Sequence, residues 1–283
     1  PRHGHKGTFG RVLVVAGSTS YYGAAALACE AAYRAGAGLV TLATPGSLVP
    51  IFATKLTEPT FWPLPEEEPG SLSPGAVAEI DRALAASDAA LIGPGLGLRP
   101  GVAAALERLL PVLDRWGQPV VLDADALNAL AGTESWWDRL GPTAVLTPHP
   151  GEFARMTRRS TAEIAAQRES LARVAARDWR QTVLLKGAHT VIAAPNGECF
   201  VSPWANPLLA SGGTGDVLAG LIAGLLAQGA AGLDAAATAV WLHAAAADRL
   251  SQDYGDAGLL ARELLPLIPR LRRELIASLA WPA

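Results

Sequence analysis

The stretch "RVLVVAGSTSYYGAAALACEAAYRAGAGLVTLA", residues 11–43, decides the fold class. Residues 11–16 and 39–43 are short apolar runs, and the segment between them, residues 24–35, is rich in alanine. Apolar runs of this length predict strands buried on both faces, and the alanine-rich segment predicts a helix. The stretch therefore predicts a strand, a crossover helix and a parallel strand, which is the repeating unit of a doubly wound α/β protein.

The same alternation continues along the chain. After residue 186, two short runs flank the turn sequence Pro195-Asn196-Gly197, which is typical of a hairpin and predicts an antiparallel edge to the sheet. The polar segment "WPLPEEEPGSLSPG", residues 62–75, predicts a surface loop. Further strands are predicted at 89–92, 120–122, 144–146 and 182–186, and helices near 75–86, 101–115, 160–178, 216–229, 233–252 and 260–279.

These elements predict a three-layer α/β/α fold with a mostly parallel central sheet and a helical C-terminal third. The chain has 283 residues, half of them hydrophobic, so it can bury a large core. Because no composition shift marks a linker, we expect a single domain over residues 1–283. The sequence begins at Pro1 without a methionine, which indicates that it was trimmed or cut from a longer chain with an N-terminal domain.

Charge and cysteine usage narrow the class of partner. The net charge is −3 and no basic stripe occurs, so we expect no nucleic-acid or membrane partner and favour a small molecule. The first residues are too polar for a signal peptide, and apolar runs such as 217–227 are shorter than the roughly 18–20 residues of a membrane span. Cys29 and Cys199 form no disulfide framework and fit a reducing cytosol, so we expect a cytoplasmic protein.

Polar and glycine-rich segments follow several predicted strands, at the edge where open parallel sheets bind ligands. A turn that lets a strand become a helix explains any one of them equally well, but their number at one edge favours a site. They are "AGSTSYYGAA" (16–25), "GPGLG" (93–97), "DADALNAL" (123–130), "TPHPGEF" (147–153) and "KGAHT" (186–190).

The segment "SGGTGD", residues 211–216, is the sharpest of these signals. Its successive N–H groups, unobstructed by side chains, and the positive end of the helix that follows predict an anion site formed by Gly212, Gly213, Thr214 and Gly215. Asp216 has two open interpretations. It is either a structural cap of the helix or a base that takes a proton from a hydroxyl attacking a phosphoryl group.

Other common site motifs are absent from the sequence. There is no P-loop, no complete G-x-G-x-x-G, no H-E-x-x-H and no G-x-S-x-G. His149 and Glu152 form only a weak metal pair, so we expect no metal held by protein side chains. A bound nucleotide would bring Mg²⁺ on its phosphates.

An ordered set of segments resembles the ADP- or ATP-dependent NAD(P)H-hydrate dehydratases, which are ribokinase-like proteins. The resemblance runs from His5 to about Leu264. It is carried by "HKGTFGRVLVVAGS", "GAAALACEAAYRAGAGLVTLATP", "IGPGLG", "VLDADALNAL", "LTPHPGEFARM", "VLLKGAHTVI" and "NPLLASGGTGDVLAGLIAGLLAQG".

This resemblance implies repair of hydrated NADH or NADPH by dehydration, driven by ADP or ATP with Mg²⁺ and passing through a phosphorylated intermediate. It implies that Asp216 is catalytic and that Gly215 contacts the nucleotide. Lys186, Gly187, Ala188, His189 and Thr190 would also line the nucleotide. Ala25, Gly95, His149 and Asp216 would contact the hydrated dinucleotide, with Asn128 and Glu152 nearby.

The resemblance also implies a homo-oligomer, with a tetramer favoured, and an epimerase as partner or fused domain. The chain departs from the family pattern at Ala205 and Leu208, and we expect the bulkier Leu208 either to narrow the approach to the phosphates or to shift the loop slightly. The resemblance favours ADP over ATP, because the family's bacterial members mostly use ADP and this chain, rich in alanine, arginine and tryptophan, looks bacterial. The sequence leaves open that choice and the preference between NADH and NADPH hydrates.

Two rival interpretations stay open. One is a ribokinase-like kinase that phosphorylates a vitamin-precursor alcohol and uses the same Asp216. The other is a regulator that binds nucleotide without turnover, which an acid beside the anion site disfavours because it would repel the phosphate.

Overall fold

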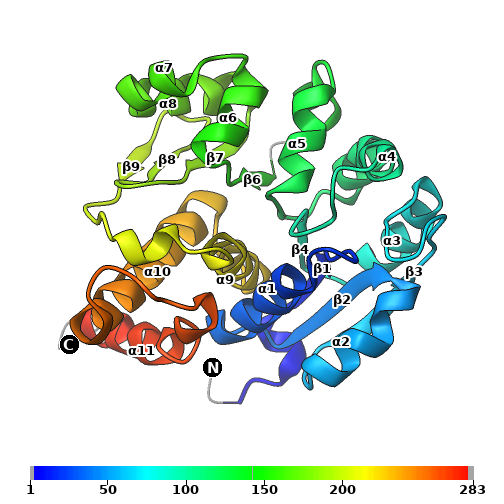
Figure 1. The fold of residues 1–283 in the computed structure, drawn as a ribbon, viewed down its shortest axis with the longest axis horizontal. Helices are drawn as coiled ribbons and strands as arrows, with labels where there is room; N and C mark the ends of the chain where they lie inside the picture. The colour runs from blue at the N-terminus through cyan, green and yellow to red at the C-terminus, as the bar shows by residue number, and fades with distance from the viewer. Residues whose placement is uncertain (1–2, 142, 280–283) are drawn as a thin grey trace.

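One central sheet organises the residues described by the computed structural model, 3–141 and 143–279. Within them the sheet has nine strands, in the order β3-β2-β1-β4-β5-β6-β7-β8-β9 (Figure 1). Strands from β3 to β7 are parallel, and β8 and β9 add an antiparallel hairpin. The strands are β1 (Arg11–Val15), β2 (Leu39–Pro45), β3 (Thr60–Leu64), β4 (Ala89–Ile92), β5 (Val120–Leu122), β6 (Ala144–Leu146), β7 (Thr182–Leu185), β8 (Val191–Ala193) and β9 (Cys199–Val201).

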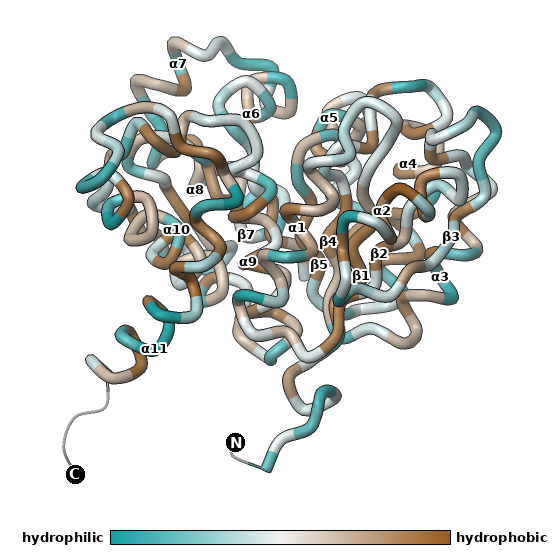
Figure 2. Tube along the Cα trace, turned by 60° about the horizontal axis from the view of Figure 1, so that its bottom comes forward, coloured by the Kyte–Doolittle hydropathy of each residue, from teal (hydrophilic) through white to brown (hydrophobic). Residues whose placement is uncertain are grey.

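Helices cover both faces of the sheet. Successive residues of β1 alternate between the two resulting cores, as the period of a strand requires. The strands carry the hydrophobic colour through the interior of Figure 2, whereas α11 is mixed in colour and extends away from the body.

The helices of the first face are α1 (Tyr22–Ala35), α2 (Val49–Lys55), α9 (Thr214–Ala227), α10 (Gly232–Tyr254) and α11 (Ile268–Leu279). Those of the second are α3 (Val77–Leu84), α4 (Pro100–Trp116), α5 (Asp125–Gly132), α6 (Pro150–Thr157), α7 (Thr161–Ala166) and α8 (Arg168–Trp179). Short 3₁₀ turns lie at Lys6–Phe9, Gly46–Leu48, Pro74–Ala76, Trp136–Arg139, Pro207–Ala210 and Ala261–Glu263.

The predicted three-layer α/β/α class is confirmed, with a mostly parallel sheet and a helical C-terminal third. The six strands predicted before the hairpin lie within one or two residues of the observed bounds of β1, β2, β4, β5, β6 and β7, and the hairpin around Pro195-Asn196-Gly197 is present. Pro1, on which the expectation of a longer chain rested, lies outside the described residues.

Three predicted elements were wrong in part. Strand β3 enters the segment predicted as a loop over 62–75, and it tolerates Pro63 because it lies at the edge of the sheet. The helix predicted over 160–178 is two helices that meet at Gln167. The helix predicted over 260–279 begins only at Ile268, after Pro266, because proline disrupts a helix interior but is tolerated before or within its first turn.

Candidate active site

A lysine and an aspartate meet where β5 and β7 end. Asp123 follows β5 and Lys186 follows β7, and Lys186 Nζ lies 2.8 Å from Asp123 Oδ1. Thr147, the residue after β6, donates its hydroxyl to the same oxygen at 2.8 Å. Three neighbouring parallel strands thus bring one polar residue each to a single point.

Charge pairing at this point outweighs desolvation. Burial acts to lower the pKa of Lys186, but the carboxylates of Asp123 and Glu152 oppose it and the pKa is raised overall. Lys186 is therefore a largely buried ammonium ion paired with Asp123, with a side chain that is 18% exposed.

Asp216 lies in the first turn of α9, close to this pair. Burial raises its pKa to about 7, Asp123 adds to the rise, and Lys186 opposes it. Lys186 Nζ would be 3.5 Å from a Cβ on Gly215, so the ammonium group borders the same helical turn. A carboxyl group that titrates near neutral pH can accept a proton from a substrate and return it to water.

The loop before α9 exposes backbone donors. Among the described residues, the N–H groups of Gly212, Gly213 and Gly215 have no hydrogen-bond acceptor. Gly213 has φ +92°, and a Cβ there would come within 2.7 Å of Leu27, so only glycine fits. The Thr214 hydroxyl donates to the carbonyl groups of Leu209 and Ser211, each at 2.8 Å, which holds the loop in this shape. The loop therefore has the free donors of an anion site.

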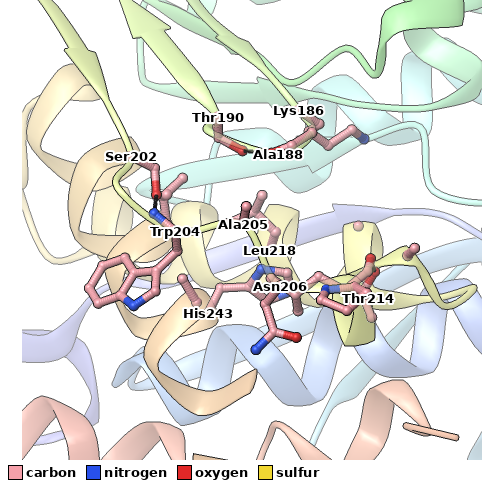
Figure 3. A pocket seen from close by; sticks show the side chains of 17 residues that line it. Lys186, Ala188, Thr190, Ser202, Trp204, Ala205, Asn206, Thr214, Leu218 and His243 are labelled. Atoms are coloured by element: carbon pink, nitrogen blue, oxygen red, sulfur yellow. Dashed lines mark hydrogen bonds between the residues drawn. The ribbon is translucent and has the colours of Figure 1, made fainter. Parts of the chain in front are cut away.

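A cavity of about 430 Å³ opens beside this loop (Figure 3). Lys186, Ala188 and Thr190 lie on one side of it, and Trp204, Asn206, His243 and Thr214 lie on the other. The Trp204 ring packs edge-on against Trp241, with centroids 6.2 Å apart. The walls of the cavity are mostly apolar, which suits a planar base bound next to a phosphate site.

Most residues predicted to line a nucleotide lie at this cavity, with three exceptions. Gly212 and Gly213 are beside it rather than in its wall. His189 instead faces the hairpin, where its Nδ1 lies 3.1 Å from the Ser202 carbonyl oxygen.

Leu208 does not line the approach to the phosphates, so the first of its two expected effects, narrowing this approach, was wrong. Its side chain is 1% exposed and packs in the core, because the 3₁₀ turn that Asn206 caps directs it inward. Ala205, the other departure from the family pattern, lies in the cavity wall.

The residues predicted for the second substrate lie outside the wall of the nucleotide cavity. His149 caps α6, where its Nδ1 accepts from the Gly151 N–H at 2.9 Å. Glu152 is 4% exposed, and burial raises its pKa to about 7. The Glu152 carboxylate in turn accepts a hydrogen bond from the His149 N–H group at 2.8 Å. These two residues thus order each other as a capping box.

Gly95, Ala25 and Asn128 occupy different settings at the same edge. Gly95 has φ +64°, and a Cβ on it would lie 2.6 Å from Tyr21 Cβ, so the two loops meet there. Ala25 is fully buried near the start of α1. Asn128, on α5, accepts from Arg155 Nε at 2.9 Å.

Sequence reasoning missed Asp123 and His243. Asp123 had a usable signal, because it is the first residue after a predicted strand. His243 had none, since it lies in the middle of α10 and only the tertiary structure brings it to the cavity. Burial lowers its pKa to about 4, which keeps it neutral at pH 7.

No group of three or more His, Cys, Asp or Glu residues in the described ranges could hold a metal ion. Within the same ranges, no helix has both the length and the apolar character needed to span a bilayer.

The open, mostly parallel sheet, with a glycine loop and an acid at the start of α9, defines the ribokinase-like class. A family model described as NAD(P)H-hydrate dehydratase matches residues 12–270. The chain belongs to the NAD(P)H-hydrate dehydratase family.

Named relatives agree with this assignment. The chain is 45% identical over 273 residues to a bifunctional NAD(P)H-hydrate repair enzyme of Moorella thermoacetica, covering 96% of this chain and 51% of that protein. It is 40% identical over 266 residues to an ADP-dependent (S)-NAD(P)H-hydrate dehydratase of Xanthomonas campestris, covering 94% and 89%. The chain thus spans about half the length of the bifunctional relatives it matches.

The fold also matches a solved structure. It superposes with a TM-score of 0.81 on a Bacillus subtilis ADP/ATP-dependent NAD(P)H-hydrate dehydratase that was co-crystallised with ATP and Mg²⁺. That protein is 35% identical, and the match covers 97% of this chain and 92% of the other.

Proposed function

We propose that this chain dehydrates hydrated NADH or NADPH to the reduced dinucleotide, using ADP or ATP as phosphoryl donor. One observation carries the proposal: Asp216 lies in the first turn of α9, between free backbone donors and the Lys186–Asp123 pair. This arrangement supports the proposal, because phosphoryl transfer to a hydroxyl group requires a base next to an anion site.

The chemistry begins at the hydroxyl group of the hydrated ring. Asp216 accepts its proton while its oxygen attacks the terminal phosphoryl group of the donor. The new phosphate ester is a better leaving group than hydroxide, so the carbon–oxygen bond breaks with a push from the ring nitrogen lone pair. Inorganic phosphate leaves, a proton is lost from the neighbouring carbon, and the dihydropyridine ring is restored.

The residues around Asp216 have separate proposed roles in binding the donor and stabilising the transferring group. The N–H groups of Gly212, Gly213 and Gly215 stabilise charge on the transferring group, and Lys186 adds a fixed positive charge. The 430 Å³ cavity takes the base of the donor between Trp204 and Thr190. Mg²⁺ bound to the donor phosphates would neutralise part of their charge.

The finer assignments follow the family resemblance. We infer that ADP is preferred to ATP, that the protein acts in the cytoplasm as a homo-oligomer, with a tetramer favoured, and that it works beside an epimerase. Lys186, Gly187, Ala188, His189 and Thr190 are proposed to contact the nucleotide. Ala25, Gly95 and His149 are proposed to contact the hydrated dinucleotide, with Asn128 and Glu152 close to it.

The test uses hydrated NADPH, Mg²⁺ and either ADP or ATP. Recovery of dihydronicotinamide absorbance together with release of inorganic phosphate is expected for the wild type, and neither for Asp216→Asn. Absence of recovery with both donors would remove the proposal. Formation of a stable phosphate ester from an alcohol would instead establish the rival kinase activity.

A further inference from the structure

A second cavity, of about 440 Å³, lies between α4, α5 and α6. These helices cover the sheet face opposite to α9 and α10, which border the nucleotide cavity. Within the described residues the two cavities share no lining residue. Apolar side chains form most of the second cavity's wall, namely Leu98, Val102, Ala103 and Ala129, with Asn128 and Arg155 as polar members.

One residue in the wall of the second cavity interacts electrostatically with Asp216. Asp125 forms part of the cavity wall and accepts from the Gly97 N–H at 2.7 Å, which joins the loop after β4 to α5. Asp125 also contributes, after burial and Asp123, to the raised pKa of Asp216. The wall of this cavity is therefore within electrostatic range of the proposed base.

Arg155 gives the cavity a positive charge. Its Nε donates to Asn128 at 2.9 Å, and both terminal amino groups lack an acceptor among the described residues. Burial, Lys186 and Arg155 all lower the pKa of His149. The charge of Arg155 therefore acts both on the cavity and on His149, a residue predicted to contact the substrate. An arginine with two free donors beside an apolar wall is suited to a phosphate that carries an aromatic base nearby.

We propose that this cavity binds the adenosine half of the hydrated dinucleotide and that Arg155 binds a phosphate group of that half. The proposal rests on the proposed function, which fixes the nicotinamide end at Asp216. The phosphoryl donor occupies the cavity over the other face of the sheet. A dinucleotide that extends away from the donor therefore passes Gly95 and Gly97 and reaches the wall formed by α4 and α5.

The first test measures equilibrium binding without a phosphoryl donor, so that it does not depend on turnover. The ligands are hydrated NADPH, hydrated NADH and hydrated reduced nicotinamide mononucleotide, which lacks the adenosine half. Arg155→Met should weaken binding of hydrated NADPH about tenfold, as expected for one lost charge-assisted hydrogen bond. The matched control is Arg158→Met, which removes an exposed arginine near the end of the same helix and should have no effect.

The three ligands distinguish the sources of the phosphate. A loss confined to hydrated NADPH assigns Arg155 to the 2′-phosphate, and an equal loss for both dinucleotides assigns it to the pyrophosphate. Both results support the subsite. An equal loss for the mononucleotide, or no loss at all, would overturn it.

A second variant fills the cavity without touching a charge. Ala103 is exposed on α4, so Ala103→Trp should fold and should weaken binding of both dinucleotides at least tenfold while leaving the mononucleotide unchanged. Arg108→Trp, on the same helix but outside the cavity, is the control. Unchanged dinucleotide binding in Ala103→Trp contradicts the subsite. Dehydration by the wild type tests the proposed function separately.

Discussion

At the scale of single residues, Asp216 is held in a setting that disfavours its own charge. Burial and three nearby carboxylates raise its pKa, and only Lys186 opposes them. A helix cap would be more effective as an ionised group facing solvent. The setting therefore favours the base interpretation over the cap interpretation of the sequence motif.

Replacing Asp216 by asparagine should separate activity from stability. The folded-state pKa of about 7 exceeds the ordinary aspartate pKa of 3.8, so the folded chain holds this proton more tightly than the unfolded chain. The resulting stabilisation is fully present below the unfolded pKa and is lost as the pH rises through the folded one. Asp216→Asn should thus abolish turnover. At pH 8 it should also raise the free energy of unfolding by on the order of 2 kcal/mol.

Thermal unfolding checks the second half of this prediction. A gain of that size corresponds to roughly 4–8 °C in Tm for a chain of this length, and the difference should shrink at pH 5. Equal Tm values for variant and wild type at pH 8 would contradict the buried, charged state of Asp216.

The pH dependence of catalysis should follow the same group. Turnover needs the carboxylate, so kcat/KM should fall about tenfold per pH unit below about 7. Glu152 is one of the charges that raise this pKa, and Glu152→Gln keeps the capping geometry of α6. The acidic limb of the profile should therefore move to lower pH in Glu152→Gln and stay in place in the exposed control Glu134→Gln. A limb that does not move would exclude coupling between the two groups.

The sequence predicted part of this site because two signals were local. A glycine loop before an apolar helix and a lysine after a strand are both visible in a short window. Asp123 had a local signal as the first residue after a predicted strand, but its pairing with Lys186 became apparent only when β5 and β7 were placed next to each other. Arg155 became informative only when the helices beyond these strands were placed as well. Burial of Lys186 likewise depends on the whole sheet, so its ion pair could not be derived from position 186 alone.

At the scale of elements, the position of Asp216 depends on how closely α9 packs on α1. A Cβ on Gly220 would lie 2.3 Å from the Ala28 carbonyl oxygen, and one on Gly224 would lie 2.6 Å from that of Ala32. The two backbones are therefore in contact along a line of glycine and alanine. The alanine-rich composition that predicts helices here also serves this close approach.

A single methyl group at this contact should displace α9. Gly220→Ala should destabilise the protein by about 1–3 kcal/mol despite the better helix propensity of alanine, because the overpacked atom is backbone. The control is Gly132→Ala in α5, where a Cβ meets nothing within 4 Å and stability should stay the same or rise. Denaturant unfolding measures both. A neutral result at Gly220 would show that the helices can separate without cost.

The sequence did not predict strand β3, because tertiary contacts rather than local sequence determine its conformation. Strand β3 contains a proline and borders an acidic loop, so its sequence looks irregular, and only pairing with β2 makes it a strand. The central strands were predictable because burial on both faces leaves an uninterrupted apolar run.

At the scale of the whole molecule, both cores share the same strands, so neither face can lose its packing alone. Aromatic clusters report on each face separately. Trp136 and Trp179 pack with centroids 5.5 Å apart under α8, and Trp204 packs with Trp241 beside the nucleotide cavity. Alternation of the strand residues between the two cores predicts that the described chain unfolds as one cooperative unit.

Fluorine NMR of the protein labelled with 5-fluorotryptophan should therefore show both clusters unfolding at one denaturant midpoint. A Mg²⁺–nucleotide complex at about 100 times its Kd should add about 2.7 kcal/mol to the free energy of unfolding. Because the sheet couples the faces, the midpoint of the Trp136–Trp179 cluster should shift as far as that of Trp204–Trp241, although only the latter borders the nucleotide. A shift confined to Trp204 and Trp241 would mean that the two layers unfold independently. The sheet would then not transmit nucleotide binding from the α9 face to the cavity between α4 and α5.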